Sequence, residues 1–305
     1  MTISLQVPAK LNPQLRVGRL REDGYHDITM VYQAISLYDT LTISHDPDGP
    51  TIQVTGMDSD CVPADDQNLV LKAAKMLGNR VGIKPRLHFS LAKKIPAEAG
   101  LGGGSADAAA ALVGCNILWN SNVSDDDLMD LAAHIGEDVP FFIKGMMALN
   151  LGHKQPLIPL ETDGKSWHWV LAIPPRGLST KAVFQKYDQS LPVPPLSEDE
   201  YLNRRQGCID APWGTASPDE LLSEMQNDLE LPSTRLLPDI AIALQAGKTA
   251  GAVKSLMSGS GSTCAFLAND ESHAKSLMGA LQKRNIFRGV FVASGPVEGV
   301  KVIRE

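Results

Sequence analysis

The chain has 305 residues, 43% hydrophobic and 21% charged, which is the ordinary balance of a globular protein with one large or two modest domains. Its net charge of −7, without a block of basic residues, argues against a nucleic-acid partner. No apolar run approaches the roughly 18 residues of a membrane span, so no membrane partner is expected.

The 4 cysteines lie far apart in the sequence and form no CxxC pair. This pattern is typical of a reducing compartment, where thiols stay unpaired. The N-terminus also lacks the charged and then apolar segments of a secretion signal. A cytoplasmic protein is therefore expected.

The first third of the chain reads mainly as strands, because apolar and polar residues alternate there. One helix, with apolar residues at helical spacing, interrupts them at 68–81. The predicted strands are 4–7, 39–43, 51–55 and 86–91.

Two helices are predicted next. The first follows a glycine-rich loop and runs from about 105 to 119. The second begins after Ser124, a predicted N-cap, with three aspartates in its first turn, and Gly136 follows its end.

The second half mixes both element types, with a Pro- and charge-rich stretch at 190–218 that predicts irregular structure. The least arbitrary domain boundary lies near residue 160, giving domains 1–160 and 161–305. The predicted helices are 219–227, 236–246 and 272–283, and the predicted strands are 167–173, two that flank 258–262, 289–293 and 300–303.

The most informative stretch is the loop at 93–107, which carries four glycines directly before an alanine-rich helix. Glycine lets the backbone approach a ligand closely, and the first N–H groups of a helix have no partner within it. The loop therefore predicts a phosphate site, although it matches neither the Walker A nor the Rossmann spacing. Ser105 would donate to a phosphate oxygen or ligate Mg²⁺, or act only as an N-cap. The alternative for the whole loop is a tight turn that needs glycine for packing.

Two further segments carry groups suited to catalysis. Asp138 lies just past a predicted helix end, beside a Val-Pro-Phe-Phe run, and could act as a general base or merely cap a turn. Lys10 and Asn12 have the same parity on a predicted strand, so their side chains point to one face. They suit a clamp for a phosphate or hydroxyl group, and the alternative is an exposed strand edge.

Two other segments suit binding. Asp23-Gly-Tyr-His26 predicts a turn that presents Tyr25 and His26 side by side, which suits a planar base by stacking and hydrogen bonding. The alternative is a plain hairpin turn. The Ser-Gly repeat at 258–262 predicts a tight loop that packs near another backbone, either in contact with a substrate or purely as a turn.

These five motifs, in this order, resemble the GHMP kinase superfamily. Its ATP-phosphate loop, P-x-x-x-G-L-G-S/G-S-S/A, is similar to residues 96–106 here. The combination of four of them, without the loop at 258–262, resembles the branch that phosphorylates 4-diphosphocytidyl-2-C-methyl-D-erythritol, a cytidine diphosphate conjugate of methylerythritol, in non-mevalonate isoprenoid precursor biosynthesis. The likeness covers nearly the whole chain.

The resemblance implies an α+β, two-domain GHMP kinase fold with the active site in the interdomain cleft. Residues 1–160 would bind the ATP phosphates and carry catalysis, and residues 161–305 would bind the substrate. Asp138 is implied as the base that deprotonates the substrate hydroxyl, with Lys10 as its partner. The implied contacts with ATP and Mg²⁺ are Gly100, Gly102, Gly103, Gly104 and Ser105 (also the tentative metal ligand), with Asn68 and Leu69 at the adenine. The implied substrate contacts are Tyr25, His26, Asn12, Phe184 and Thr180.

The sequence departs from the family pattern in two places. At 150–156, where the family carries a Gly-x-Gly-Arg-Gly-Glu-like segment, only Gly152 is kept. Pro13 also follows Asn12, and proline cannot donate a hydrogen bond to a sheet, so the strand there should be an edge or be broken. The alternatives are a homoserine- or mevalonate-type kinase and a nucleotide-binding homologue without catalysis. A monomer or a homodimer is expected.

Overall fold

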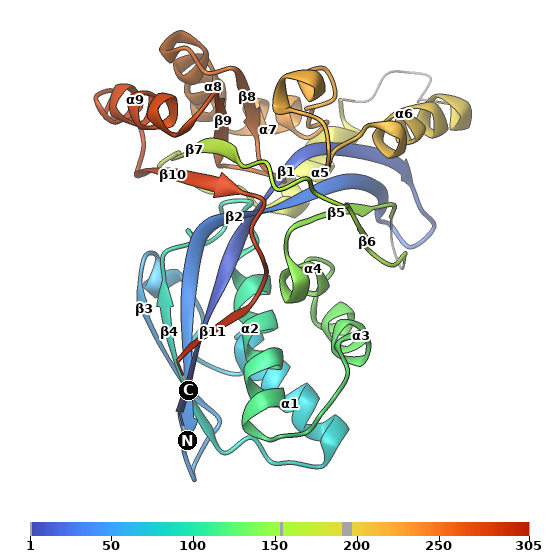
Figure 1. Ribbon diagram of the computed structural model, residues 1–305. Coiled ribbons are helices and arrows are strands. Elements are labelled where there is room, and N and C mark those ends of the chain that lie inside the picture. Colours follow the sequence, from blue (N-terminus) through green and yellow to red (C-terminus); the bar gives the residue numbers. More distant parts are fainter. Residues whose placement is uncertain (1, 153–154, 191–196, 305) are drawn as a thin grey trace.

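The computed structural model describes residues 2–152, 155–190 and 197–304 (Figure 1). The N- and C-terminal ends lie next to each other at the lower end of the molecule in Figure 1. None of the helices in these three ranges has the length and apolar content needed to cross a bilayer.

The first sheet occupies the lower and central part of Figure 1, in the strand order β11-β1-β2-β4-β3, and β5 pairs with β2 and with β6. Strands β3 and β4 are parallel, whereas the other pairs are antiparallel. The strands are β1 (Thr2–Leu20), β2 (His26–His45), β3 (Thr51–Gly56), β4 (Leu87–Lys93), β5 (Met147–Asn150), β6 (Ile158–Pro159) and β11 (Lys301–Arg304).

Strands β1 and β2 form a long hairpin that reaches from the first sheet into the upper part of the molecule (Figure 1). Pro13 does not break β1. The register shifts between Leu11 and Gln14, so Pro13 lies in a bulge where its missing N–H costs no ladder hydrogen bond. At the tip, Gly24 has φ of 83°, a conformation that favours glycine.

Helices pack on one side of this sheet: α1 (Leu69–Val81), α2 (Gly103–Leu118), α3 (Asp125–Ile135) and α4 (Val139–Lys144). Helix α2 is apolar around most of its circumference, as expected for a helix enclosed by other elements. Its small residues let it lie close to the sheet. A Cβ atom at Gly114 would come within 2.5 Å of Ile43 Cδ1.

The second sheet has the order β10-β7-β9-β8, and helices α8 and α9 cover its outer face at the top of Figure 1. Helices α5, α6 and α7 surround the upper end of the β1–β2 hairpin. The elements are β7 (Trp167–Ile173), β8 (Lys254–Met257), β9 (Cys264–Ala268), β10 (Gly289–Gly295), α5 (Thr180–Asp188), α6 (Glu198–Asp210), α7 (Glu230–Leu236), α8 (Pro238–Ala250) and α9 (Glu271–Gln282), with 3₁₀ turns at Ser59–Cys61 and Pro218–Leu221.

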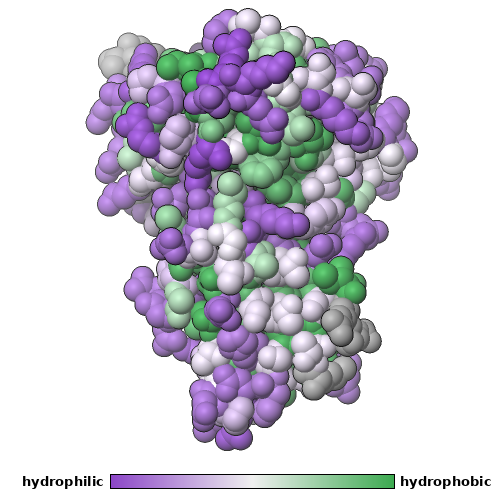
Figure 2. All heavy atoms as spheres, turned by 90° about the vertical axis from the view of Figure 1, so that its left-hand side faces the viewer, coloured by the Kyte–Doolittle hydropathy of each residue, from purple (hydrophilic) through white to green (hydrophobic). Residues whose placement is uncertain are grey.

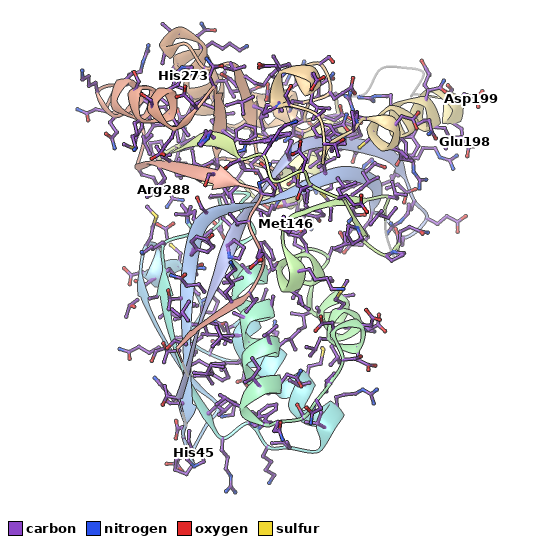
Figure 3. All side chains as sticks on the ribbon, viewed as in Figure 1. His45, Met146, Glu198, Asp199, His273 and Arg288 are labelled. Atoms are coloured by element: carbon purple, nitrogen blue, oxygen red, sulfur yellow. The ribbon has the colours of Figure 1, made fainter. Side chains whose placement is uncertain are left out.

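The two parts are joined by backbone and side-chain bonds at the level of Met146 in Figure 3. Met146 N–H donates to Val297 O at 2.7 Å, and Trp169 Nε1 donates to Gln33 Oε1 at 2.8 Å. In Figure 2, hydrophilic side chains dominate the lower end of the molecule, whereas apolar ones gather nearer its middle. The second sheet begins at β7, as a domain boundary near residue 160 would require. Strand β11, however, belongs to the predicted second domain and pairs with the first sheet, so this boundary stays a prediction.

Most predicted elements are confirmed within one to four residues at each end. The predicted strands 4–7 and 39–43, however, are only parts of the much longer β1 and β2, and the stretch after 190 also differs from its prediction. Residues 198–210, predicted irregular, form α6, and Ser197 and Glu200 make a capping box at its start. Residues 191–196, also part of that prediction, lie outside the described residues. The predicted helix 219–227 is reduced to the 3₁₀ turn at Pro218–Leu221. The acidic residues Glu198, Asp199 and Asp210 are exposed on α6, whereas Arg204 turns inward to bind Asp228 at 2.7 Å.

Candidate active site

The glycine loop ends at Gly102, which caps α2 in the left-handed conformation with φ of 73°. The first helical hydrogen bond runs from Ala106 N–H to Gly102 O at 2.9 Å. The N–H groups of Gly103, Gly104 and Ser105 precede that bond and have no acceptor within the helix, and the positive end of the helix dipole lies there. This is the geometry of an anion seat. Since Gly102 occupies the cap position, the reading of Ser105 as an N-cap is wrong.

Lys10 lies directly beside this loop. Its backbone N–H donates to Leu101 O at 3.0 Å. A Cβ atom at Gly102 would come within 3.1 Å of Lys10 Cγ and 2.6 Å of the Phe142 ring, so a larger residue would not fit there. Lys10 and Asn12 are 5% and 0% exposed, which rules out the exposed-edge alternative. As their parity predicted, they share a face, and Lys10 Nζ donates to Asn12 Oδ1 at 2.5 Å.

Asp138 completes this group. It lies between α3 and α4, at the N-terminal boundary of α4, with Pro140 in the first turn. Its Oδ2 atom is 4.0 Å from Lys10 Nζ, and its side chain is 30% exposed. The structure therefore brings a partly open carboxylate and a buried ammonium group together beside the anion seat.

The sequence analysis missed Tyr32 of β2. Its hydroxyl donates to Asp138 Oδ1 at 2.6 Å, and its ring is fully buried. In the sequence, its only signal is that it shares parity with Ala34, the cross-strand neighbour of Lys10.

Burial and charge act differently on these groups. Burial lowers the pKa of Lys10, and the charge of Asp138 offsets that only in part. Burial, the charge of Asp138 and their hydrogen bond hold the pKa of Tyr32 well above its ordinary value. Tyr32 therefore keeps its proton and acts as a donor.

The predicted nucleotide-binding residues surround the same helix terminus. Asn68 caps α1 by accepting a hydrogen bond from Val70 N–H at 2.9 Å. Leu69 follows it, and its Cδ1 atom would lie 3.7 Å from a Cβ atom at Gly104. On the other side, the 258–262 loop packs against the glycine loop, where Ser258 Oγ donates to Gly100 O at 3.0 Å. The prediction that this loop packs near another backbone is confirmed.

A second lysine, also missed, lies beneath the glycine loop. Lys93 Nζ donates to Asp39 and to Asp107 Oδ2, the latter at 2.6 Å. It would lie 3.1 Å from a Cβ atom at Gly103. Asp39 Oδ1 also accepts the backbone N–H of Ile95 at 2.9 Å. The three charged side chains are almost completely enclosed, and Lys93 and Asp107 flank the glycine loop in sequence.

Two of the predicted base-binding residues, His26 and Phe184, meet at the upper end of the hairpin. His26 is stacked on Phe184, with ring centroids 5.7 Å apart, and its Nδ1 and Nε2 atoms lie 2.8 Å from Gly18 O and Asp188 Oδ1. Both ring nitrogens of His26 thus have protein partners. A nucleobase bound here would therefore stack on aromatic rings and take its hydrogen bonds from other groups, such as the backbone. Tyr25, beside His26, is 70% exposed. Thr180 Oγ1 is 2.9 Å from Ser260 Oγ, which places Thr180 at the 258–262 loop.

A cavity of about 400 Å³ lies between the upper part of the hairpin and the Asp138 segment. Its wall includes His26, and also Glu137 and Pro140, which flank Asp138 in the sequence. Asn150, Gly152 and Gln155 also line it, so the segment that departs from the family pattern forms part of this wall. His153 and Lys154 of that segment lie outside the described residues.

Two family models match the chain, GHMP kinases N terminal domain at residues 68–146 and GHMP kinases C terminal at residues 215–286. The 4-diphosphocytidyl-2-C-methyl-D-erythritol kinase of Streptomyces coelicolor is 40% identical over 306 residues, covering 99% of this chain and 100% of that protein. The kinase of the same name from Nocardia farcinica is 42% identical, covering 99% of this chain and 96% of its own length. The chain belongs to this family of GHMP kinases.

Solved structures agree. A crystal structure of a 4-(cytidine 5′-diphospho)-2C-methyl-D-erythritol kinase has a TM-score of 0.73 at 30% identity, covering 96% of this chain and 98% of the other. Homoserine kinase from Cytophaga hutchinsonii has a TM-score of 0.74 at 20% identity and covers 99% of this chain and 97% of its own, which shows the shared fold alone. The predicted α+β GHMP kinase fold and the kinase activity are thereby confirmed.

Proposed function

We propose that this kinase transfers the γ-phosphoryl group of ATP to the C2 hydroxyl of 4-diphosphocytidyl-2-C-methyl-D-erythritol, a step of non-mevalonate isoprenoid precursor biosynthesis. The observation that carries the proposal is the convergence of three features. The N-terminus of α2 adjoins the Lys10–Asp138 pair, and a cavity lined by His26 reaches Glu137 and Pro140, which flank Asp138.

In this mechanism, Asp138 accepts the proton of the substrate hydroxyl as its oxygen forms the new bond to phosphorus. The bond from phosphorus to the ADP oxygen breaks, and the N–H groups at the start of α2 stabilise the charge that stays on the phosphates. Lys10, 4.0 Å from Asp138, stabilises the transferring group. The transition state of such reactions is loose, so alignment and charge stabilisation account for most of the rate.

The residues present also fit Mg²⁺. This cation takes few protein ligands and completes its shell with phosphate oxygens and water. The part-buried Ser105, in the first turn of α2, is the residue that would hold it. Bound there with ATP, Mg²⁺ would neutralise phosphate charge. Gly100, Gly102, Gly103 and Gly104 would surround the phosphates, with Asn68 and Leu69 at the adenine.

The aromatic residues around His26 support the choice of substrate class. A homoserine- or mevalonate-type alcohol carries no base, and would leave the aromatic cluster of Tyr25, His26 and Phe184 without a role. A cytosine ring would stack there, with Asn12 and Thr180 closer to the methylerythritol part. We place the enzyme in the cytoplasm, as a monomer or homodimer. The described cysteines form no disulfide, which supports a reducing compartment.

The deciding experiment measures ADP release with the cytidine substrate, homoserine, mevalonate and no acceptor. We expect turnover only with the cytidine compound. Faster turnover with either simple alcohol would overturn the substrate assignment. An absence of turnover with every acceptor would favour a homologue that binds nucleotide without catalysis.

A second measurement tests the base-binding corner. Tyr25→Ala should weaken binding of the cytidine substrate by about 1–3 kcal/mol, the usual worth of stacking on one base. Its KM for ATP should not change, since Tyr25 lies at the hairpin tip away from the glycine loop. A raised KM for ATP with an unchanged KM for the cytidine substrate would show that the two pockets are assigned wrongly.

A further inference from the structure

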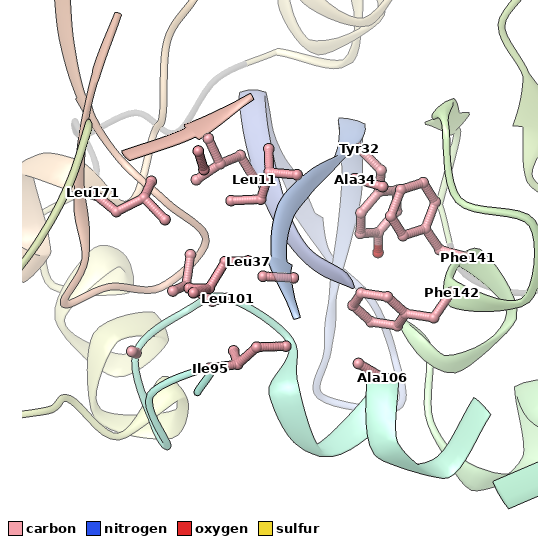
Figure 4. Close-up of a cluster of buried hydrophobic side chains, with 14 of the residues drawn as sticks. Leu11, Tyr32, Ala34, Leu37, Ile95, Leu101, Ala106, Phe141, Phe142 and Leu171 are labelled. Atoms are coloured by element: carbon pink, nitrogen blue, oxygen red, sulfur yellow. The ribbon is translucent and has the colours of Figure 1, made fainter. Parts of the chain in front are cut away.

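The buried phenol of Tyr32 contacts the carboxylate that the proposed mechanism uses as its base. Tyr32 lies in β2, paired with Ala148 of β5, and is 0% exposed. Its ring stacks on Phe141, with centroids 4.8 Å apart and planes 21° from parallel (Figure 4). Phe141 is three residues after Asp138 and belongs to α4. The ring is therefore held from both sides, by its own strand and by the helix that carries Asp138.

This packing fixes where the hydroxyl points. The Tyr32 oxygen lies 2.6 Å from Asp138 Oδ1, within the short range of hydrogen bonds to ionised acceptors. Lys10 Nζ lies nearer the other oxygen, Oδ2, and 5.9 Å from the centre of the Tyr32 ring. The two carboxylate oxygens are thus distinguished by their surroundings. Oδ1 is occupied by a donor, and Oδ2 faces the ammonium group beside the anion seat.

We propose that Tyr32 is a positioning residue. It fixes the rotation of the Asp138 carboxylate so that Oδ2 takes the substrate proton, and it stabilises the ionised carboxylate. This rests on the proposed function, because it assigns Tyr32 a role through Asp138. Towards Asp138, Tyr32 acts as a hydrogen-bond donor and exchanges no proton, which agrees with the raised pKa of its hydroxyl.

The groups that set the charge around Asp138 come from three segments. They are Lys10 of β1, Tyr32 of β2 and Glu137 next to Asp138. A hydrogen bond from a fixed donor holds a carboxylate in one orientation. Removing only the Tyr32 donor should therefore let the Asp138 carboxylate rotate and leave Lys10 in place.

The test uses Tyr32→Phe, which keeps the ring that stacks on Phe141 and removes one oxygen. We expect kcat with the cytidine substrate to fall about tenfold near neutral pH, the effect of one charged hydrogen bond, with KM for ATP unchanged. KM for the cytidine substrate should change little, since Tyr32 is fully buried. Tyr201→Phe is the matched control, since Tyr201 is a buried phenol on α6 that packs on Gly18, and its kcat should not change.

A double variant separates positioning from other roles. If Tyr32 acts through Asp138, Y32F should slow the Asp138→Asn enzyme little further. A full additional tenfold loss in that background, or an unchanged kcat in Y32F, would overturn the inference while leaving the proposed function intact. Absence of turnover by the unaltered enzyme would instead refute the proposed function, and this inference with it.

Discussion

Two buried lysines lie against the glycine loop, Lys10 at Gly102 and Lys93 at Gly103, and their partners differ. Lys10 has one carboxylate, Asp138, at 4.0 Å, and that carboxylate is partly exposed. Lys93 is bound by two enclosed carboxylates, Asp39 and Asp107, at hydrogen-bond distance. Lys10 therefore has charge left for an incoming phosphate, whereas the charge of Lys93 is already satisfied within the protein.

The protonation of the two lysines follows the same contrast. Burial lowers the pKa of Lys10, since a single carboxylate at 4.0 Å does not compensate for it. Burial would also lower the pKa of Lys93, but Asp107 and Asp39 outweigh it and the net shift is upward. We infer that the first lysine serves the reaction and the second holds the loop in place.

The largest expected effect is a loss of activity on changing Asp138, the partner of Lys10. Asp138→Asn should lower kcat by roughly 10²- to 10⁴-fold, the usual size of a lost general base. Stability should change little, because an asparagine oxygen can still accept the Tyr32 hydrogen bond and the side chain is partly exposed. Single-turnover kinetics and urea denaturation measure the two quantities. Near-normal turnover would remove Asp138 from the mechanism.

Asp39→Asn should have the opposite pattern, with a large loss of stability as its main effect. Asp39 is 0% exposed and accepts hydrogen bonds from Lys93 and from the backbone N–H of Ile95. Breaking a buried ion pair costs about 3–5 kcal/mol, because it leaves a buried charge without its full compensation. The free energy of unfolding, from urea titration, should fall by that amount. An unchanged unfolding curve would show that the cluster is not structural.

The sequence analysis identified the Lys10–Asp138 pair but missed the Lys93 cluster, and the reason is physical. Lys10 and Asn12 are two residues apart on one strand, so alternation alone put them on one face. The glycine loop and Asp138 were marked by local signals, namely glycines before a helix and a helix end followed by a Val-Pro-Phe-Phe run. Local rules of that kind reach only a few residues along the chain.

The missed contacts join residues that are distant in sequence. Lys93 and Asp39 are 54 positions apart, and Tyr32 and Asp138 are 106 apart. Their pairing depends on the register of β2 against β4 and β5, which no single segment specifies. The wrong prediction at helix α6 has a different cause. Its capping box, Ser197 to Glu200, was readable, but the neighbouring prolines and charges were given more weight.

The smallest predicted effect tests the charge balance of the Lys93 cluster. The enclosure of Asp107, together with the charge of Asp39, raises the pKa of Asp107 to about 8 even though Lys93 opposes it. In the unfolded chain that carboxyl titrates at about 3.9. Between these values the folded protein keeps a proton that the unfolded chain releases, so this group makes stability fall as pH rises towards about 8.

Asp107→Asn mimics the protonated side chain and removes that pH dependence. Its free energy of unfolding should rise relative to the unaltered protein by about 1–2 kcal/mol between pH 6 and pH 8, and the difference should then level off. Urea titrations of both proteins at a series of pH values measure it. If the two proteins keep a constant difference throughout, Asp107 is ionised in the folded state. Lys93 would then be balanced by two full charges, and the contrast with Lys10 would be larger than described.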